Sequence, residues 1–358
     1  MNTLRTIADY ENAALGKLGA GLADYVQKTA GEGRTFRSNL GAYSQYGLVA
    51  GSSSSAFRVP ATSLRLIDRG IIWAPIMIAP TAWHGMFTPR GEAATSAAAR
   101  MFGTNFVISS FSTLDFPQID SRLSHAWYQL LMYKDLGLMK RYIDRAIDAG
   151  CSAIVLTVDA VNGCSMCKTD PAIPVVEYPL HKLPIFPEDP AVPYTTFDDY
   201  YDKYMPKKLD WEDVRELVSY TRVSMVPVVI KGVLTAEDVL KAVEVGAKAV
   251  IISNHGGRQN DGLPATLEAL ALLPTDVRDR IEIYLDGGIR SGSDVFKAIA
   301  LGAKAVFIGR PALYGLAVNG EKGLTSVLFI LIQELRASMR LTGCNSLQEI
   351  GSDNVTKV

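Results

Sequence analysis

Short apolar runs rich in valine and isoleucine recur along the chain, and a segment whose apolar residues have helical spacing follows each of them. Such runs are typical of parallel strands that are buried on both faces. The eight candidate strands are residues 76–80, 105–109, 126–131, 153–157, 226–231, 249–253, 281–285 and 305–309. This alternation predicts an α/β protein, and the count of eight favours a closed (β/α)8 TIM barrel over an open sheet.

Two consecutive helix-to-strand segments share the same order of residues. An Asp-Val-x-Lys-Ala sequence at 238–242 and again at 294–298 is followed by Gly-Ala-Lys-Ala-Val at 246–250 and 302–306. The glycine predicts a helix that ends and turns directly into the next strand. Chance similarity between alanine-rich helices would explain the composition of these segments but not their matched order.

Three regions lie outside this alternation. We predict an N-terminal helical and irregular extension over residues 1–75, with residues 52–55 in an exposed loop. The proline-rich residues 160–208 predict a long loop after the fourth strand, and we expect it to cover the C-terminal mouth of the barrel. Residues 321–342 have the spacing of a closing amphipathic helix. Together with the eight strand-helix units, these regions predict a single barrel domain over residues 1–358.

Composition and charge exclude several classes of protein. The formal net charge of -1 gives no general attraction for nucleic acid or for an anionic membrane surface. The apolar stretch 70–83 contains Pro75 and Pro80 and falls short of the roughly 20 residues that span a bilayer, so we expect no transmembrane segment. The four cysteines are too few and too scattered for a disulfide framework, and no secretory signal precedes them. These features predict a cytoplasmic protein.

The segment 253–259, Ser-Asn-His-Gly-Gly-Arg-Gln, carries the most informative chemistry of the chain. It places an imidazole and a guanidinium in one short turn after an apolar run, and oxidation of a hydroxy acid requires a proton acceptor beside a fixed cation. Lys231 ends another apolar run, and the segments 286–290 and 309–311 each combine glycine with arginine. Glycines let a phosphate approach the backbone, and arginine pairs with it bidentately. This combination suggests a flavin enzyme.

At these residues the chain resembles the FMN-dependent α-hydroxy acid oxidase and dehydrogenase family, the group that contains glycolate oxidase, lactate oxidase and mandelate dehydrogenase. The motifs that carry the resemblance are Ala79-Pro80-Thr81-Ala82, Ser109-Ser110, Gln129, Leu156-Thr157-Val158-Asp159, Lys231-Gly232, the 253–259 segment and Leu285-Asp286-Gly287-Gly288. Seven motifs in the family order, over nearly the whole chain, are highly specific. The resemblance implies a (β/α)8 barrel with FMN at its C-terminal end.

The resemblance also implies roles for individual residues. His255 would be the base that accepts the proton of the substrate hydroxyl, and Asp159 would hold and stabilise the imidazolium. Lys231 would face the flavin ring and stabilise negative charge on it. The alternatives are a turn histidine with purely structural hydrogen bonds and a lysine on the solvated surface. Arg258 would bind the substrate carboxylate, and Tyr25 would assist in catalysis.

The remaining site residues are expected to contact FMN. The residues expected along the isoalloxazine ring are Thr81, Ala82, Ser109, Gln129, Thr157 and Ser253. The residues expected around the ribityl chain and the phosphate are Asp286, Gly287, Gly288, Arg290, Gly309 and Arg310. The family often forms homotetramers, so a homo-oligomer is expected as well.

Two departures from the family pattern concern the substrate. Leu131 stands where the family has a tyrosine, and Ser165 stands where it has a second arginine for the carboxylate; Lys168 supplies only a flexible charge nearby. Losing a charged hydrogen bond costs about 1.5–3 kcal/mol, or roughly tenfold to more than a hundredfold in affinity. We therefore expect weak binding of small acids and a substrate that is larger, differently charged, or recognised by the long loop and apolar contacts.

Cys164 and Cys167 allow other interpretations of the same loop. Their spacing suits a redox dithiol or half of a zinc site, but no second ligand pair is visible in the sequence, so no metal is expected. A loop cysteine could also be a nucleophile, as in barrels that resemble inosine monophosphate dehydrogenase. The interpretation that we favour is that small residues here make room for a bulky substrate.

We thus predict an enzyme that oxidises a 2-hydroxy acid to a 2-oxo acid, with His255 removing a proton and a hydride equivalent passing to the flavin. Ala82 stands where dehydrogenase members often have glycine, which favours dioxygen as the acceptor and hydrogen peroxide as the product. One alternative is a repurposed family member that oxidises an amine, an amino acid or a biosynthetic intermediate. A second alternative is a flavin-binding protein without turnover.

Overall fold

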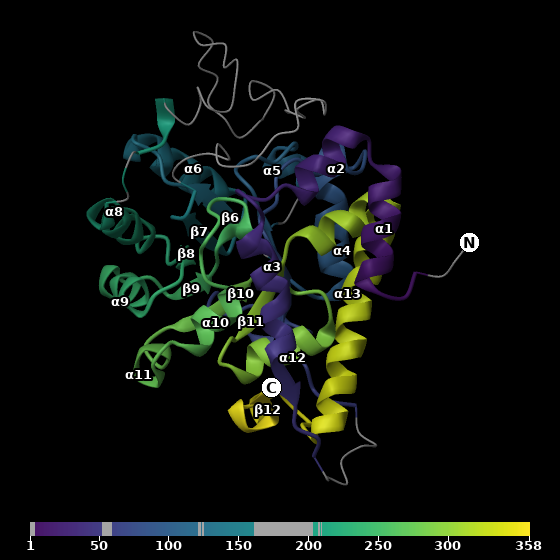
Figure 1. The fold of residues 1–358 in the computed structure, drawn as a ribbon. Coiled ribbons are helices and arrows are strands. Elements are labelled where there is room, and N and C mark those ends of the chain that lie inside the picture. Colours follow the sequence, from purple (N-terminus) through teal and green to yellow (C-terminus); the bar gives the residue numbers. More distant parts are fainter. Residues whose placement is uncertain are drawn as a thin grey trace.

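Eight parallel strands form a closed barrel in the order β10-β11-β4-β5-β6-β7-β8-β9 (Figure 1). This computed structural model describes residues 4–51, 59–120, 123, 125–160, 203–206, 208 and 210–358. In chain order the barrel strands are β4 (Ile76–Ile78), β5 (Phe106–Ile108), β6 (Ala126–Leu131), β7 (Ala153–Thr157), β8 (Val228–Val233), β9 (Ala249–Ile252), β10 (Glu282–Asp286) and β11 (Ala305–Ile308). The predicted (β/α)8 barrel is confirmed, and each predicted strand overlaps one of these eight.

Helices surround the barrel on its outside (Figure 1). They are α4 (Gly91–Phe102), α5 (Phe116–Ile119), α6 (Leu136–Asp148), α8 (Trp211–Thr221), α9 (Ala236–Val245), α10 (Thr266–Ala271), α11 (Thr275–Arg278), α12 (Gly292–Ala300) and α13 (Arg310–Thr342). The repeated sequence noted above forms α9 with β9 and α12 with β11. In each copy the N-cap of the helix is a residue with a hydroxyl group, Thr235 or Ser291. The chain enters the strand shortly after a glycine with a positive φ angle, Gly246 or Gly302.

The last helix, α13, is longer than the predicted closing helix. It has non-helical backbone angles at Asn319 and Gly320, and the predicted helix 321–342 corresponds to the part after this break. By length and composition alone, α13 would be long and apolar enough to cross a membrane. It packs against α1, α4 and α12, and its buried side chains include Leu324, Leu328 and Leu331. These contacts are those of a core helix.

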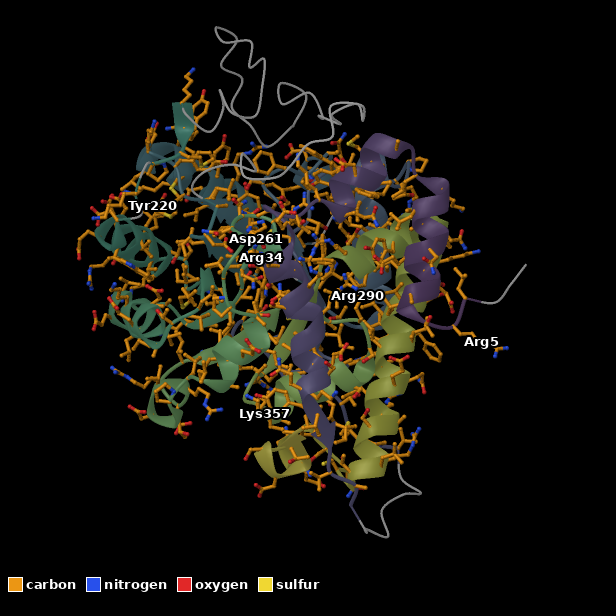
Figure 2. All side chains as sticks on the ribbon, viewed as in Figure 1. Arg5, Arg34, Tyr220, Asp261, Arg290 and Lys357 are labelled. Carbon is orange, nitrogen blue, oxygen red and sulfur yellow. The ribbon has the colours of Figure 1, made fainter. Side chains whose placement is uncertain are left out.

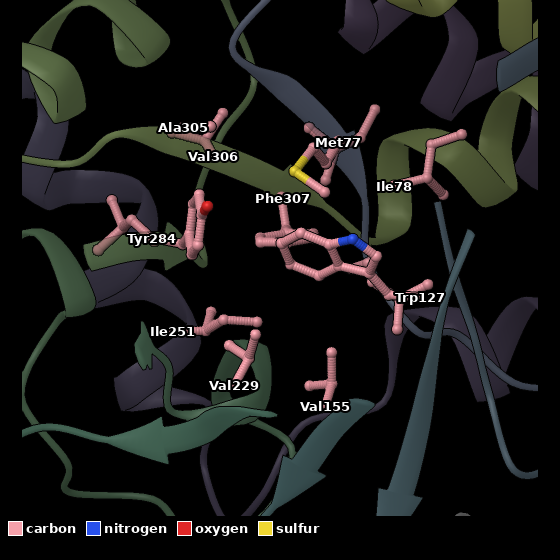
Figure 3. Packing of buried hydrophobic residues seen from close by; sticks show 14 of the residues in the cluster. Met77, Ile78, Trp127, Val155, Val229, Ile251, Tyr284, Ala305, Val306 and Phe307 are labelled. Carbon is pink, nitrogen blue, oxygen red and sulfur yellow. The ribbon is translucent and has the colours of Figure 1, made fainter. Parts of the chain in front are cut away.

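Aromatic side chains fill the interior of the barrel. The rings of Trp127, Tyr284 and Phe307 come from β6, β10 and β11, and their centroids lie 5.7–5.9 Å apart. Figure 3 shows them together with Val155 and other aliphatic side chains of neighbouring strands. All three rings are almost completely buried. The barrel is therefore a packed core, and its chemistry must lie at an end of the strands.

The described part of the N-terminal extension contains the helices α1 (Ile7–Lys17), α2 (Ala20–Gln27) and α3 (Arg34–Gly41), and the short 3-10 helix η1 (Ala42–Gln45). Its strand β1 (Tyr46–Leu48) pairs antiparallel with the C-terminal strand β12 (Val355–Lys357). The strands β2 (Leu64–Arg65) and β3 (Ile71–Ile72) form a second small sheet. Helix α1 lies along α13 on the outside of the barrel (Figure 1). The predicted loop 52–55 lies outside the described residues, as does nearly all of the predicted loop 160–208.

Candidate active site

Lys231 lies at the centre of a polar cluster where the barrel strands end. Its Nζ donates to Ser253 Oγ at 2.9 Å and lies 3.5 Å from Asp286 Oδ2 and 3.9 Å from Asp159 Oδ2. Only 4% of the side chain is exposed, which excludes the alternative of a solvated surface lysine. Burial alone would lower the pKa of Lys231, but the two carboxylates raise it above its usual value. The cluster therefore holds a buried ammonium ion.

Asp159 connects this lysine to the predicted base. Its Oδ1 lies 3.1 Å from Nδ1 of His255, whose side chain is 28% exposed. Burial would raise the pKa of Asp159, but Lys231 and His255 hold it below its usual value, so the carboxylate stays ionised. An ionised carboxylate can only accept, so in neutral His255 Nδ1 carries the proton and Nε2 is the basic atom.

The backbone around His255 explains why this turn is so rich in glycine. His255, Gly256 and Gly257 all have positive φ angles, of 58°, 64° and 72°. The side chain of Asn254 caps this turn, η5 (His255–Gly257), by accepting from the amide of Gly257 at 3.2 Å. Histidine is among the few non-glycine residues that are enriched in this conformation. The turn thus lifts the imidazole from the strand end toward Asp159.

Gly232 allows the close approach of Asp159 to β8. It lies in β8, where the pairing with β9 shifts register between Lys231 and Val233, and its φ is 106°. A Cβ atom at this position would collide with the side chain of Asp159. Glycine here therefore allows the carboxylate of Asp159 to lie close to β8, next to Lys231.

Three buried oxygen atoms of the cluster have no hydrogen-bond partner in the described part of the chain. They are Oγ1 of Thr157, Oδ2 of Asp159 and Oδ1 of Asp286. Thr157 pairs in register with Lys231 on one side and with Leu131 on the other, so all three belong to the same end of the barrel. Buried polar atoms normally have partners, so this end is suited to polar groups that the described residues do not supply.

Gln129 lies in β6, two residues before the end of that strand. Its Oε1 accepts from the amide and the hydroxyl of Ser110, both at 3.2 Å, and from Ser109 Oγ at 3.4 Å. These donors fix the orientation of the amide, since its oxygen must face the serines and its NH2 group must face away. Gln129 therefore presents its side-chain NH2 group as a hydrogen-bond donor.

Thr81 and Ala82 follow β4. Thr81 Oγ1 lies 2.7 Å from Nε2 of His84, in the 3-10 helix η3 (His84–Met86). Ala82 is partly buried and precedes Trp83, which has a positive φ of 60° and is 3% exposed. The ring of Trp83 lies 5.0 Å from that of Tyr25, so the extension brings the predicted tyrosine to the strand ends.

Gly309 is the N-cap of α13. A Cβ atom placed on it would meet only Thr81 Cγ2, at 3.7 Å, among the described residues. An uncrowded start of a long helix suits an anion, because the first backbone N–H groups and the helix dipole both favour negative charge. The predicted phosphate role of this glycine is consistent with that geometry.

Gly287 and Gly288 also have a packing role, and their predicted contact with FMN stays a prediction. Their φ angles are 96° and 80°, and a Cβ on Gly288 would collide with the backbone carbonyl of Asn39. Tyr43 of the extension donates its hydroxyl to the carbonyl of Gly287 at 2.9 Å. These glycines therefore let α3 and η1 of the extension approach the strand end.

Arg258 and Arg310 hold the segment 25–28 of the extension. Arg258 Nη1 donates to the carbonyl of Tyr25 at 2.8 Å, and its guanidinium lies 4.9 Å from the centre of the Tyr25 ring. Arg310 donates to the carbonyls of Val26 at 2.8 Å and of Lys28 and Gly256 at 3.0 Å. Both cations thus lie where the extension meets the predicted site. Their predicted contacts with substrate carboxylate and phosphate remain predictions.

The three arginines of the site are close enough to affect one another. Burial, together with the charges of Arg258 and Arg290, lowers the pKa of Arg310 to about 9. Arg290 donates Nη1 to the carbonyl of the preceding residue at 2.9 Å. A partly buried group of cations is stabilised by an anion, which favours a negatively charged ligand at this place.

Several residues that position the site were not identified from the sequence. Asp261 accepts from the amides of Glu32 at 2.8 Å and Thr35 at 2.9 Å at the start of α3. Figure 2 shows Arg34 and Asp261 next to each other there. The side-chain amides of Asn39 and Asn254 donate to each other at 2.8 and 2.9 Å. These pairs join residues more than 200 positions apart, and no local signal reveals them.

The residues that depart from the family pattern are placed as follows. Leu131 is 3% exposed at the end of β6. Tyr133, two residues further on, does not take the place of the tyrosine that the family has at position 131. Its ring packs against that of Tyr142 of α6, with the ring centroids 6.0 Å apart. Ser165, Lys168, Cys164 and Cys167 lie outside the described residues. Within the described ranges, no group of three or more His, Cys, Asp or Glu side chains could hold a metal ion.

Comparison with known proteins gives consistent matches over almost the whole chain. The family model described as FMN-dependent dehydrogenase matches residues 14–357. The 2-hydroxyacid oxidase 1 of Homo sapiens is 34% identical, over 98% of this chain and 96% of the relative. The L-lactate oxidase of Nostoc sp. is 36% identical, over 96% and 95%. The crystal structure of mandelate oxidase has a TM-score of 0.83 and 30% identity, over 99% of this chain and 98% of that chain.

Proposed function

The chain belongs to the FMN-dependent dehydrogenase family and uses FMN as its cofactor, and from this we propose that it oxidises a 2-hydroxy acid to the 2-oxo acid and passes the electrons to dioxygen. Its relatives by sequence include 2-hydroxyacid, glycolate and lactate oxidases. The coarser conclusion, an oxidoreductase that acts on a CH–OH group, follows from family membership. The acceptor and the substrate class are the proposed part.

The described residues fit FMN. Oγ1 of Thr157 and Oδ1 of Asp286 are buried without a hydrogen-bond partner in the described ranges, as a ring and chain rich in polar atoms require. Gln129 presents its amide NH2 group, and Lys231 supplies a buried positive charge. Gly309 leaves the helix start next to Arg310 uncrowded. When bound, FMN supplies an acceptor for two electrons.

The protein residues then have separate roles. Nε2 of His255 accepts the proton of the substrate hydroxyl, and the ionised Asp159 stabilises the imidazolium that forms. A positioned base of this kind contributes roughly 10²–10⁴-fold to the rate. The ammonium group of Lys231, held by two carboxylates, stabilises negative charge that develops in the site. Arg258 binds the substrate carboxylate.

The substrate that fits best carries a large apolar group. Leu131 is an aliphatic side chain at a strand end, and the rings of Tyr25 and Trp83 pack together beside Arg258. Aromatic rings bind other apolar or aromatic groups well but give a small acid such as glycolate little to contact. One solved mandelate oxidase structure contains (S)-4-hydroxymandelic acid, an aromatic 2-hydroxy acid. We therefore place aryl-substituted 2-hydroxy acids ahead of glycolate and lactate.

The single observation that carries this function is the 3.1 Å contact between His255 Nδ1 and Asp159 Oδ1 beside buried Lys231. The test is to load the protein with FMN under anaerobic conditions and to follow flavin absorbance with glycolate, lactate, mandelate and 4-hydroxymandelate. We expect bleaching that is fastest with the aromatic acids, and formation of hydrogen peroxide when air is admitted.

Other outcomes would contradict the proposal in distinguishable ways. Bleaching by amines or amino acids but by no hydroxy acid would indicate a repurposed family member. Tight retention of FMN without bleaching by any compound would indicate a flavin-binding protein without turnover. Bleaching by mandelate that air does not reverse would leave the hydroxy acid assignment intact but would exclude dioxygen as the acceptor.

A further inference from the structure

His84 is a buried histidine that the mechanism above does not use. It is 2% exposed, and each of its ring nitrogens lies 2.7 Å from a threonine hydroxyl, Nε2 from Thr81 Oγ1 and Nδ1 from Thr95 Oγ1 of α4. The imidazole therefore joins the loop after β4 to the helix behind it.

Glu92 holds the backbone of this histidine. Its buried carboxylate accepts from the amide of His84 at 3.1 Å, from the amide of Thr113 at 3.0 Å and from the hydroxyl of Thr113 at 2.6 Å. Three donors satisfy the carboxylate and tie the loop after β4 to the loop after β5. The backbone of His84 is thus held independently of the two hydroxyl partners of its ring.

A neutral imidazole has one N–H donor and one acceptor nitrogen. Burial lowers the pKa of His84 below its usual value, although the charge of Glu92 opposes this, so the ring is neutral near pH 7. With a hydroxyl on each nitrogen, one threonine must accept and the other must donate. The hydroxyl of Thr81 is therefore directional: its single proton points either to His84 or away from it.

Thr81 is one of the residues assigned to FMN, and it lies between the end of β4 and Gly309 at the start of α13. We propose that His84 is a positioning residue that fixes the direction of the Thr81 hydroxyl and thereby tunes the reduction potential of the bound FMN. This inference rests on the proposed function, because only that function places the flavin beside Thr81.

Two substitutions separate the two ends of the imidazole. In His84→Gln the side-chain amide reaches as far as Nε2 does, so it keeps the contact with Thr81 and loses the one with Thr95. In His84→Asn the shorter amide reaches only as far as Nδ1 does, so it keeps the contact with Thr95 and loses the one with Thr81. The pair is matched in chemistry and differs in which hydroxyl remains held.

The measurement is the two-electron reduction potential of FMN in the wild type and in both variants, with thermal unfolding as the control for folding. For His84→Asn we expect a change of at least about tenfold in the binding of reduced relative to oxidised FMN, which is about 30 mV for a two-electron couple. For His84→Gln we expect a potential within about 10 mV of the wild type, roughly a third of that shift.

Equal potentials in all three proteins would overturn the inference and leave His84 as a link between loop and helix. A shift in His84→Gln but not in His84→Asn would also overturn it, since the helix contact would then be the important one. Should His84→Asn fail to fold, Thr81→Val removes the hydroxyl that His84 holds, and an unchanged potential in that variant would equally overturn the inference. A wild type that does not retain FMN would refute the proposed function instead.

Discussion

Asp68 at the N-terminal end of the barrel and Asp159 at its C-terminal end have carboxylates that are held by different kinds of partner. At the N-terminal end, Asp68 Oδ2 accepts from Trp127 Nε1 at 2.8 Å, from Ser152 Oγ at 2.6 Å and from Asn105 Nδ2 at 3.4 Å, while Oδ1 accepts from the amide of Gly70 at 2.9 Å. At the C-terminal end, Oδ1 of Asp159 faces His255, and Oδ2 has no hydrogen-bond partner in the described part of the chain.

The difference separates stability from reactivity within one fold. Asp68 is surrounded by neutral donors that satisfy it, so it joins strand starts and has no capacity left for a ligand. Asp159 is held mainly by the charges of Lys231 and His255, so its energy depends on the protonation of its neighbours. A carboxylate with many neutral donors thus marks a structural site, and one that relies on titratable partners marks a reactive site.

Replacing His255 should produce the largest effect. His255→Asn is the suitable change, because asparagine also tolerates the positive φ of 58° at this position. We expect kcat for an aromatic 2-hydroxy acid to fall by roughly 10²–10⁴-fold, since the base is lost, with FMN absorbance and thermal unfolding nearly unchanged. A kcat within a few-fold of the wild type would show that another group removes the proton.

Replacing Lys231 should affect stability in a pH-dependent way. In the wild type the lowered pKa of Asp159 makes its carboxylate stabilising above about pH 4, and this contribution is lost as the pH falls through the lowered pKa. In Lys231→Met burial would dominate and raise the pKa of Asp159. An ionised Asp159 would then destabilise the folded state at pH 7, and protonation would relieve this as the pH falls.

We expect Lys231→Met to lose about 3–5 kcal/mol of unfolding free energy at pH 7 and clearly less at pH 4. Urea unfolding of the wild type and the variant at both pH values measures this difference. Lys304→Met is a matched control, because Lys304 pairs with Glu282 at 2.9 Å near the outer surface with 38% of its side chain exposed. A loss that is equal at the two pH values would contradict the coupling between Lys231 and Asp159.

Replacing Asp68 tests the other end of the barrel. Asp68→Asn keeps the size of the side chain but turns one acceptor oxygen into a donor, which then faces the N–H of Trp127 or the amide of Gly70. We expect a loss of about 2–3 kcal/mol in unfolding free energy, with kcat and KM unchanged in the fraction that is folded. A large fall in kcat without a loss of stability would mean that this end takes part in the chemistry.

The sequence predicts the barrel well because each strand is a local apolar run. The ends of β6 and β7 match the predictions, whereas β8 continues two residues past its predicted end at Lys231, since the bulge at Gly232 keeps pairing with β9. A bulge depends on the neighbouring strand and on the close approach of Asp159, and neither is visible in a local pattern.

The site is only partly predictable for the same reason. Its charged residues stand in short motifs at strand ends, and the structure brings His255, Asp159 and Lys231 together. The glycines at 287 and 288 predict room for phosphate, but the local pattern does not reveal that they also allow the close approach of the extension. The hydrogen bonds of Asn39 and Asp261 depend on tertiary packing alone.

The smallest predicted effect concerns Leu131, where the C-terminal end of the barrel has an apolar side chain in register with Thr157. Leu131→Tyr would place a phenolic hydroxyl among the buried oxygens of this end. One added hydrogen bond is worth about 0.5–1.5 kcal/mol, so we expect KM for lactate or glycolate to fall by roughly 2–10-fold.

The larger ring occupies space that a bulky substrate needs, so KM for mandelate should rise. Steady-state kinetics of Leu131→Phe, which adds the ring without the hydroxyl, separates the two effects. Improved binding of small acids in Leu131→Phe as well would show that the hydroxyl is not the cause.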